Sequence, residues 1–340
     1  MEHGTNNTTR RGVLRGLAGG TAILAAGAPT LVRAAEKKPL IGMVPKYTSD
    51  PYFTAIKQGA EEACKECNFE LLFDGPANQD ITAQANIVDR MIRQGINALS
   101  LCASDPSALA PAAKRAASRG IKVSTWDSDL DPSARPVFLN QSEFGAMGAT
   151  IADMMAKATD GGKGDFLLVT NSFTSTNMNH WREAIKSYAA KKYPDMHIKA
   201  ELSGDADLEK SKNVTLNYLR ANPNTRGVIV IDGIAAVGAA EAVDQLGLKG
   251  KVPVAGIGVP SNIRPYIKSG TVFESVLWNP VDLGYGAMYI CKAQLDGTLD
   301  PKKGFVDAGR LGKMKFISDD VVLLGPPTVF TKENIDQFHF

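Results

Sequence analysis

Carboxylate, amide and aromatic side chains stand at the ends of several expected strands in this sequence. In the segment 121–129, an alternating β-prone run ends in Trp126 and Asp127, and Asp129 follows two residues later. The carboxyl ends of strands in an open parallel sheet face the ligand crevice, so we expect Asp127 to contact a solute. An Asp at a strand end can instead cap the following helix or turn. Two acids and a Trp are more than one cap requires, which favours the binding interpretation.

Four other expected strand ends carry side chains of the same kinds. Carboxylates and amides form hydrogen bonds with sugar hydroxyls, and aromatic faces cover the apolar side of a sugar ring. Taken singly, Phe53 and Trp278 are equally well explained as core residues. The repetition over five strand ends nevertheless predicts a binding cleft. The expected ligand-binding residues are Lys46, Tyr52, Phe53, Asp127, Asp129, Asn177, Asn179, Asp232, Trp278 and Asn279.

Few patterns in the sequence indicate catalysis. The four histidines show no HxH or HExxH spacing, which argues against a catalytic metal. The Gly-rich segments 160–164 and 256–260 lack P-loop and dinucleotide-binding spacing, and no GxSxG motif occurs. Four cysteines are too few for a disulfide framework in an exported chain of this length, and they are interpreted as structural thiols. We therefore expect no catalytic residue, no metal and no cofactor.

Strand patterns and amphipathic stretches alternate along most of the chain. This alternation predicts an α/β fold with parallel sheets and right-handed crossovers. The helix at 105–119 with the strand that ends at Asp127 resembles the helix at 235–246 with the strand that ends at Gly258. The chain after residue 35, about 305 residues, also exceeds what one core usually holds, so we expect two similar lobes with a cleft between them. The strands are expected at about 39–45, 69–73, 98–102, 121–126, 136–139, 165–170, 197–202, 227–231, 252–256 and 271–277.

The first 35 residues are expected to be an export signal rather than part of the fold. Arg10 and Arg11 precede an apolar, Gly/Ala-rich stretch at 16–28, and small residues surround a cleavage site near Ala34/Ala35. This pattern predicts a twin-arginine leader and a periplasmic protein. A basic arm for nucleic acid is the alternative, but it has no use for the apolar run. The formal net charge of +2 also gives no indication of a nucleic-acid partner.

A further series of motifs occurs in order along the chain: Val44-Pro45-Lys46, Asp50-Pro51-Tyr52-Phe53, Phe73-Asp74-Gly75-Pro76, Thr125-Trp126-Asp127-Ser128-Asp129, Asn140-Gln141, Arg264-Pro265-Tyr266 with Gly270-Thr271-Val272, Leu277-Trp278 and Phe330-Thr331-Lys332-Glu333-Asn334-Ile335. In these motifs the sequence resembles the type I periplasmic solute-binding proteins of sugar ABC transporters, from about Leu40 to its end. The resemblance is closest to the branch that holds rhamnose-binding proteins and the autoinducer-2 receptor. It implies two Rossmann-like lobes joined by hinge strands, a small sugar or polyol ligand, and an ABC transporter permease in the inner membrane as the partner. We expect a monomer.

By that resemblance, Lys46 and Asp127 match ligand-contacting positions of the autoinducer-2 receptor. The match breaks at Asn177-Met178, where that receptor has Asp-Gln, and at Ile231-Asp232-Gly233, where it has Pro-Asp-Ala. The loss of a carboxylate changes which hydroxyl pattern a pocket can satisfy. We therefore expect a small monosaccharide or polyol, with autoinducer-2 or a related furanosyl signal as the alternative.

The first lobe is expected over 36–140 and about 279–319, and the second over 141–278 and about 320–340. Hinge strands near 140, 258 and 279 would let the lobes close on a solute without converting it. Two other classes of protein stay open at this point. A periplasmic sugar-modifying enzyme would use Asp127 and Asp232 as an acid/base pair, and a cytoplasmic repressor would need a helix-turn-helix where the export leader stands.

Overall fold

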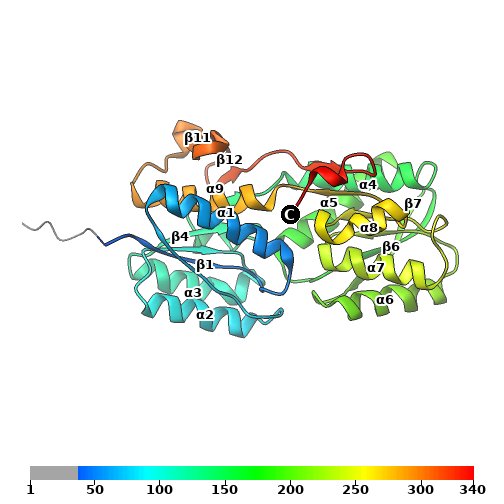
Figure 1. Cartoon of the computed structure of the whole chain (residues 1–340), viewed down its shortest axis with the longest axis horizontal. Coiled ribbons are helices and arrows are strands. Elements are labelled where there is room, and N and C mark those ends of the chain that lie inside the picture. Colours follow the sequence, from blue (N-terminus) through cyan, green and yellow to red (C-terminus); the bar gives the residue numbers. More distant parts are fainter. Residues whose placement is uncertain (1–36) are drawn as a thin grey trace, which may run out of the picture. The chain divides into compact units, whose positions relative to one another are not determined.

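Two β-sheets, each with helices packed on both faces, form the part of the chain that this computed structural model describes, residues 37–340 (Figure 1). The expected export signal over 1–35 and its cleavage site lie outside the described residues. Most strands within each sheet are parallel, as the alternation of strands and helices predicts. In the described residues, no helix has both the length and the apolar character needed to cross a bilayer.

The first lobe is built on an eight-stranded sheet of order β11-β12-β13-β5-β4-β3-β1-β2. Its strands are β1 (Leu40–Val44), β2 (Glu70–Phe73), β3 (Ala98–Leu101), β4 (Lys122–Trp126), β5 (Phe138–Asn140), β11 (Phe305–Asp307), β12 (Lys313–Ser318) and β13 (Val321–Leu323). Its helices pack as two pairs, α1 (Pro51–Cys67) with α9 (Pro280–Leu295), and α2 (Ile81–Arg93) with α3 (Pro106–Ser118). Figure 1 shows the two pairs on opposite faces of the sheet.

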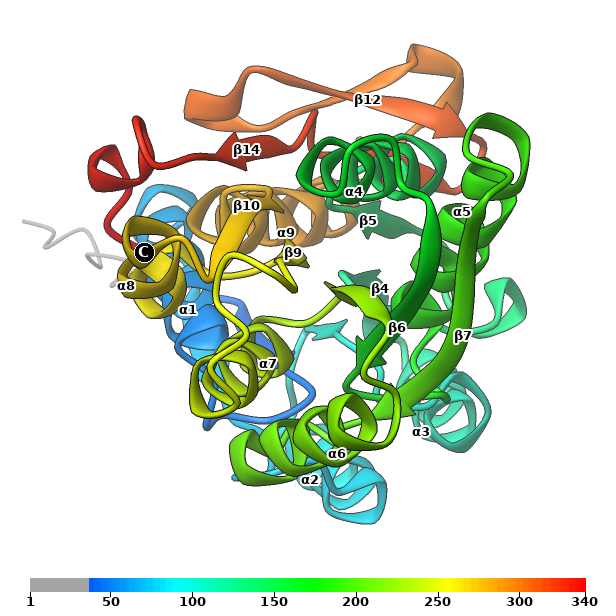
Figure 2. The same cartoon turned by 90° about the vertical axis from the view of Figure 1, so that its right-hand side faces the viewer.

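The second lobe is built on a six-stranded sheet of order β14-β10-β9-β8-β6-β7. Its strands are β6 (Gly164–Thr170), β7 (Met196–Ser203), β8 (Thr225–Val230), β9 (Val254–Ile257), β10 (Val272–Leu277) and β14 (Thr328–Phe330). Its helices are α4 (Phe144–Ala158), α5 (Thr176–Lys192), α6 (Leu208–Ala221), α7 (Gly233–Gln245) and α8 (Pro260–Ser269). Figure 2 looks onto this lobe, with α4 and α5 on one side of the sheet and α6 and α7 on the other.

Within residues 37–340 the chain passes between the two sheets three times, after β5, after β10, and between β13 and β14. The expected hinge near 258 was wrong, because β9 and β10 are neighbours in the same sheet and Gly258 leads into α8 of the second lobe. The third crossing also falls later than about 320. Val321 pairs in parallel with Phe138 of β5, so β13 belongs to the first lobe.

Two glycines hold α9 against α1 although α9 follows the second crossing. A Cβ atom on Gly59 would lie 1.8 Å from the carbonyl oxygen of Val281, and one on Gly284 would lie 1.9 Å from that of Ile56. The two helix backbones therefore touch at positions where no side chain fits. This contact fixes the start of α9, and with it the crossing segment that carries Trp278, against the first lobe.

Candidate ligand-binding site

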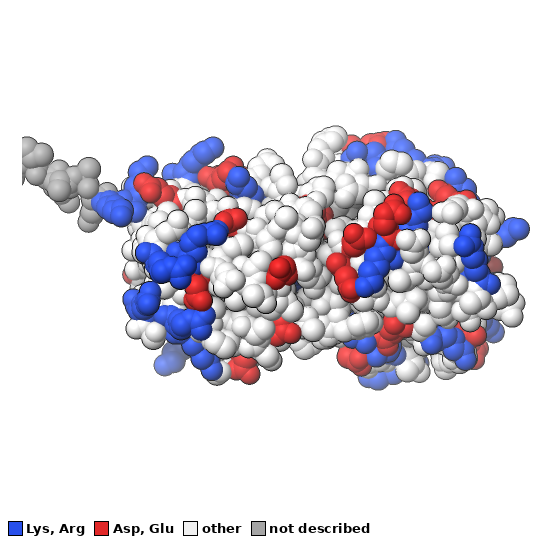
Figure 3. Space-filling view, turned by 90° about the horizontal axis from the view of Figure 1, so that it is seen from below, with Lys and Arg blue, Asp and Glu red and all other residues white. Residues whose placement is uncertain are grey.

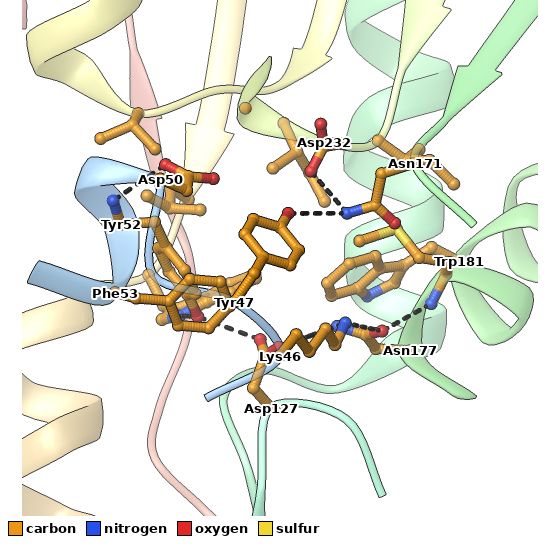
Figure 4. Close-up of a pocket in the computed structure, with 17 residues that line it drawn as sticks. Lys46, Tyr47, Asp50, Tyr52, Phe53, Asp127, Asn171, Asn177, Trp181 and Asp232 are labelled. Carbon is orange, nitrogen blue, oxygen red and sulfur yellow. Dashed lines mark hydrogen bonds and ion pairs between the residues drawn. The ribbon is translucent and has the colours of Figure 1, made fainter. Parts of the chain in front are cut away.

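A small cavity lies between the two lobes, and both contribute residues to its wall (Figure 4). The cavity volume is about 40 Å³, counted as the space open to the centre of a water molecule. One water needs roughly 10–15 Å³ on this measure, so the cavity has room for a small solute only. Its lining consists of Lys46, Tyr47, Asp50, Tyr52, Phe53 and Asp127 of the first lobe, Asn171, Asn177, Met178, Trp181, Ile231, Asp232, Gly233, Ile257, Val259 and Leu277 of the second, and Trp278 of the crossing segment.

The charged side chains that line this cavity are buried. Lys46, Asp127 and Asp232 are 2%, 3% and 5% exposed. On the face shown in Figure 3, the Lys, Arg, Asp and Glu side chains lie mainly over the outer parts of the two lobes, and the band between them is largely uncharged. A ligand in the cavity therefore meets charges that water barely screens.

Asp127 enters the cavity from a sharp turn at the end of β4. Its φ of 61° lies in the left-handed region, which non-glycine residues seldom adopt. The amide of Ser128 donates to the carbonyl of Trp126 across this turn, at 2.7 Å. Such strained single residues are concentrated at binding and catalytic sites, where surrounding contacts maintain them.

Three polar groups of the cavity surround the Asp127 carboxylate. The Tyr52 hydroxyl donates to Oδ1 at 2.9 Å, the Asn177 amide donates to Oδ2 at 3.2 Å, and Lys46 Nζ lies 3.6 Å from Oδ2. Lys46 also donates to Asn177 Oδ1 at 3.0 Å. Behind the cavity wall, the Cys102 thiol lies 3.2 Å from Oδ2. Because Asn177 belongs to α5, this network joins the two lobes directly.

Aromatic rings form one wall of the cavity. Tyr52 and Trp278 meet edge to face with ring centroids 6.0 Å apart, and the Trp278 indole N–H donates to the Tyr52 hydroxyl at 3.0 Å. Trp181 lies 5.5 Å from Trp278, again between ring centroids, and Phe53 lies 5.1 Å from Tyr52. These rings offer flat apolar surface next to the hydrogen-bonding groups, which suits the C–H face of a sugar or polyol.

At the opposite end of the cavity, two Asp residues cap helices from the two lobes. Asp50 Oδ1 accepts from the Tyr52 amide at the start of α1, and Asp232 Oδ1 accepts from the Ala235 amide at the start of α7, both at 2.9 Å. The Asn171 amide donates to Asp232 Oδ2 at 2.8 Å and to the Tyr47 hydroxyl at 3.2 Å. Helix N-termini favour such carboxylates.

Burial shifts the pKa values of the titratable side chains at the Asp50 and Asp232 end of the cavity. It raises the pKa of Asp50 to about 7, and the Asp232 carboxylate raises it further, while the hydrogen bond from the Tyr52 amide opposes the shift. Burial also raises the pKa of Asp232, with the Ala235 amide and the Lys46 ammonium acting against it. The pKa of Tyr47 lies well above its ordinary value because of burial and then the charge of Asp232 and Asp50. Tyr47 is thus a neutral phenol at physiological pH, and Asp50 takes up a proton at a higher pH than an ordinary Asp does.

Comparison with known proteins matches residues 41–299 to the family described as Periplasmic binding protein domain. The chain belongs to this family. Among similar proteins, the xylitol-binding protein of Mycolicibacterium smegmatis is 26% identical over 292 residues, which cover 85% of this chain and 76% of that protein.

Two solved structures extend the comparison to the fold of the binding protein. LsrB from Clostridium saccharobutylicum in complex with AI-2 is 26% identical with a TM-score of 0.83, covering 88% of this chain and 100% of that one. An ABC transporter solute-binding protein from Clostridium phytofermentas with bound L-rhamnose is 25% identical with a TM-score of 0.82, covering 88% and 98%. The two-lobed type I fold expected from the sequence is confirmed.

Most residues that the sequence analysis singled out lie together in the cavity of the binding protein. They come from both lobes and from the crossing segment after β10, and they line one cavity although they are far apart in the chain. The expected residues that line the cavity are Lys46, Tyr52, Phe53, Asp127, Asn177, Asp232 and Trp278.

Three expected residues, by contrast, do not line this cavity. Asp129 turns away and pairs with Arg135, whose Nε lies 2.9 Å from Oδ1. Asn179 lies on α5, donates to the Phe173 carbonyl and accepts from Arg182. Asn279 caps α9 by accepting from the Val281 amide at 2.9 Å. In each case a local partner satisfies the polar side chain, a role that short polar residues often fill near helix starts and turns.

Several lining residues were missed, and some had a signal in the sequence. Asp50 directly precedes Pro51, and this pair marks the start of a helix beside Lys46. Trp181 lies four residues after Asn177, which places both on one face of α5. Asn171 follows β6 immediately and is nearer to the strand end than Asn177 is. The remaining missed residues are Tyr47, Met178, Ile231, Gly233, Ile257, Val259 and Leu277.

Proposed function

We propose that this protein is the solute-binding component of an ABC importer, and that it holds one small monosaccharide or polyol between its lobes without converting it. The observation that carries the proposal is the small cavity between the lobes, whose wall combines buried acceptors and donors with the rings of Phe53, Trp181 and Trp278. Its free space of about 40 Å³ suits one small solute and excludes an oligosaccharide.

The lining favours a sugar or polyol over autoinducer-2. Asn177 and Met178 both line the cavity, and they stand where the autoinducer-2 receptor, by resemblance, has Asp-Gln. The Asn177 amide is already committed to Asp127 and Lys46, while Met178 offers no strong hydrogen bond. The ligand here therefore meets apolar surface where that receptor offers polar groups.

Asp127 is arranged for binding rather than for acid/base catalysis. A general acid or base in a reaction must exchange its proton with the substrate. Asp127 accepts from Tyr52 and Asn177 and pairs with Lys46, so both of its oxygens already have partners within the protein. Incubation of the protein with its tightest-binding solute should return that solute unchanged, and repeated conversion would favour the enzyme interpretation.

Three consecutive hydroxyls at the start of α5 support closure of the lobes. Thr174 and Ser175 each donate to the Ser104 carbonyl of the first lobe at 3.1 Å, and Thr176 donates to the Asp129 carbonyl at 2.8 Å. A solute that contacts both lobes would favour the same closed state. The closed form would then dock on an inner-membrane permease, and we propose that the protein acts there as a monomer.

The export signal over 1–35 is proposed from the sequence, and membership of the periplasmic family supports a periplasmic location. Replacing Arg10 and Arg11 by Lys should retain the protein in the cytoplasm. A normal periplasmic yield of that variant would argue against the twin-arginine route.

A thermal-shift screen of the mature protein against small sugars and polyols tests the proposed function. A ligand at about 100 times its Kd adds about 2.7 kcal/mol to the free energy of unfolding, so a true ligand should raise the melting temperature by several degrees. No shift with any small sugar or polyol would contradict the proposal.

A further inference from the structure

The charges of the cavity do not balance within its own lining. Three carboxylates, those of Asp50, Asp127 and Asp232, line the cavity, and Lys46 is the one Lys or Arg among the lining residues. The Lys46 ammonium lies 3.6 Å from Asp127 and therefore compensates that carboxylate. Asp50 and Asp232 have no ion-pair partner within 4 Å in the described part of the chain.

Helix ends offset part of the remaining negative charge. Asp50 caps α1 and Asp232 caps α7, and each helix N-terminus supplies roughly half a positive charge. Two carboxylates against two helix ends leave about one negative charge at this end of the cavity. Asp50 and Asp232 are only 4% and 5% exposed, so water does little to stabilise that charge.

The same end offers acceptors for hydrogen bonds. Asp50 uses Oδ1 for the Tyr52 amide, and its Oδ2 has no hydrogen-bond donor among the described residues. Figure 4 shows Asp50 and Asp232 on one side of the cavity, opposite Lys46 and Asp127, with the Tyr47 hydroxyl between the two carboxylates. The strong donors of the cavity, on Lys46, Tyr52 and Asn177, are bonded at the Asp127 end. Asp232 already accepts from the Ala235 and Asn171 amides, so among the described residues Asp50 Oδ2 is the carboxylate oxygen at this end that a donor on the ligand would satisfy.

We propose that the ligand carries a primary ammonium group that lies between Asp50 and Asp232, so that the solute is an amino sugar or an amino polyol. This inference rests on the proposed function and specifies the class of solute. An ammonium group supplies one positive charge and three N–H donors with no acceptor, whereas a hydroxyl supplies one donor and no charge. In the ligand-free cavity, a proton on Asp50 meets the same need, and the raised pKa of that carboxyl is consistent with this.

Matched pairs of compounds test this proposal by calorimetric titration at pH 7. The pairs are D-glucose with D-glucosamine, D-galactose with D-galactosamine, and xylitol with 1-amino-1-deoxyxylitol. In the pair that fits the cavity best, the amine should bind at least about tenfold more tightly, because charge-assisted hydrogen bonds are stronger than neutral ones.

Two variants locate the ammonium group. Asp50→Asn keeps a good helix cap and should fold, but it should abolish most of the preference for the amine. Asp127→Asn removes a carboxylate that Lys46 already compensates, so it should weaken both members of a pair by a similar factor and preserve their ratio. The affinity for 1-amino-1-deoxyxylitol should also rise between pH 6 and 8, as Asp50 loses its competing proton, whereas the affinity for xylitol should not.

The possible outcomes separate this proposal from the proposed function. Tighter binding of the neutral compound in every pair overturns the amine proposal and leaves sugar binding in place. An amine preference that survives Asp50→Asn overturns the assignment of the ammonium to this carboxylate pair. No binding by any of the six compounds, together with no hit in the thermal-shift screen, contradicts both.

Discussion

Replacement of Asp127 by Ala should prevent stable closure on a ligand while leaving the two lobes folded. The Lys46 side chain is 2% exposed when the lobes lie together, and Asp127 is the acid with which it pairs in the described structure. Without Asp127, the closed state buries an ammonium whose one remaining hydrogen-bond acceptor among residues 37–340 is Asn177 Oδ1. When the lobes separate, water can reach Lys46, so the cost falls on closure and not on folding.

The size of this effect follows from the burial of the pair. Removing one partner of a buried ion pair costs about 3–5 kcal/mol, which corresponds to a loss of affinity between about a hundredfold and several thousandfold. Calorimetric titration with the tightest-binding solute gives the affinity, and a thermal melt without ligand gives the stability. Adding Lys46→Met to Asp127→Ala removes the unpaired ammonium, so the double variant should bind no more weakly than Asp127→Ala alone.

Asp129→Ala is the matched control. Asp129 pairs with Arg135, whose side chain is 2% exposed, but both belong to the first lobe and neither lines the cavity. Its loss should lower the melting temperature by several degrees and leave the affinity within about threefold. Near-normal affinity of Asp127→Ala would contradict this role of Asp127, and so would a loss of ligand-free melting temperature as large as that of Asp129→Ala.

Three further predictions concern packing, closure and pH. Gly284→Ala should lower the melting temperature strongly or prevent folding, because its Cβ would meet the Ile56 carbonyl at 1.9 Å, whereas Gly325→Ala has open space and should be neutral in the same melt. Thr176→Val removes the hydrogen bond to the Asp129 carbonyl and should weaken ligand binding about three- to tenfold through faster dissociation, measured by stopped flow. Thr150→Val, which removes a hydrogen bond inside α4, should leave that rate unchanged. Burial raises the pKa of Asp50 to about 7 in the folded protein, so its contribution to stability is fully present below about pH 4 and is lost as the pH rises through about 7. The ligand-free melting temperature should therefore fall between pH 5 and 8 in the wild type and fall less in Asp50→Asn; an equal slope in both would contradict this.

The alternation of strands and helices was sufficient to predict the two sheets, because each βαβ unit has its own periodic pattern and its own turn residues. The strands after residue 304 were not predicted. β11 and β13 have three residues each, and β11 and β12 pair in antiparallel fashion, so no α-helix between them separates the strands in the sequence. The hinge at 258 was wrongly expected for a related reason. Strand order decides which strand ends lead to the other lobe, and hydrophobic periodicity does not encode strand order.

The site was predicted where a side chain's position follows from the end of a strand. Asp127 directly follows β4, and Asp232 is the second residue after β8. Both side chains line the cavity. Asp129 is only two residues beyond Asp127, yet the turn at Asp127 directs it to Arg135 instead. Ile257 lines the cavity because the two lobes come together, and no local pattern marks that contact.

A crystal structure of the mature protein grown with the tightest-binding compound from the thermal-shift screen tests the central claim most directly. We expect density for one unmodified molecule in the cavity between the lobes, within hydrogen-bond distance of both Asp127 or Lys46 at one end and Asp232 or Asp50 at the other. Density for that compound only on the outer surface, with the cavity unoccupied, would contradict the account.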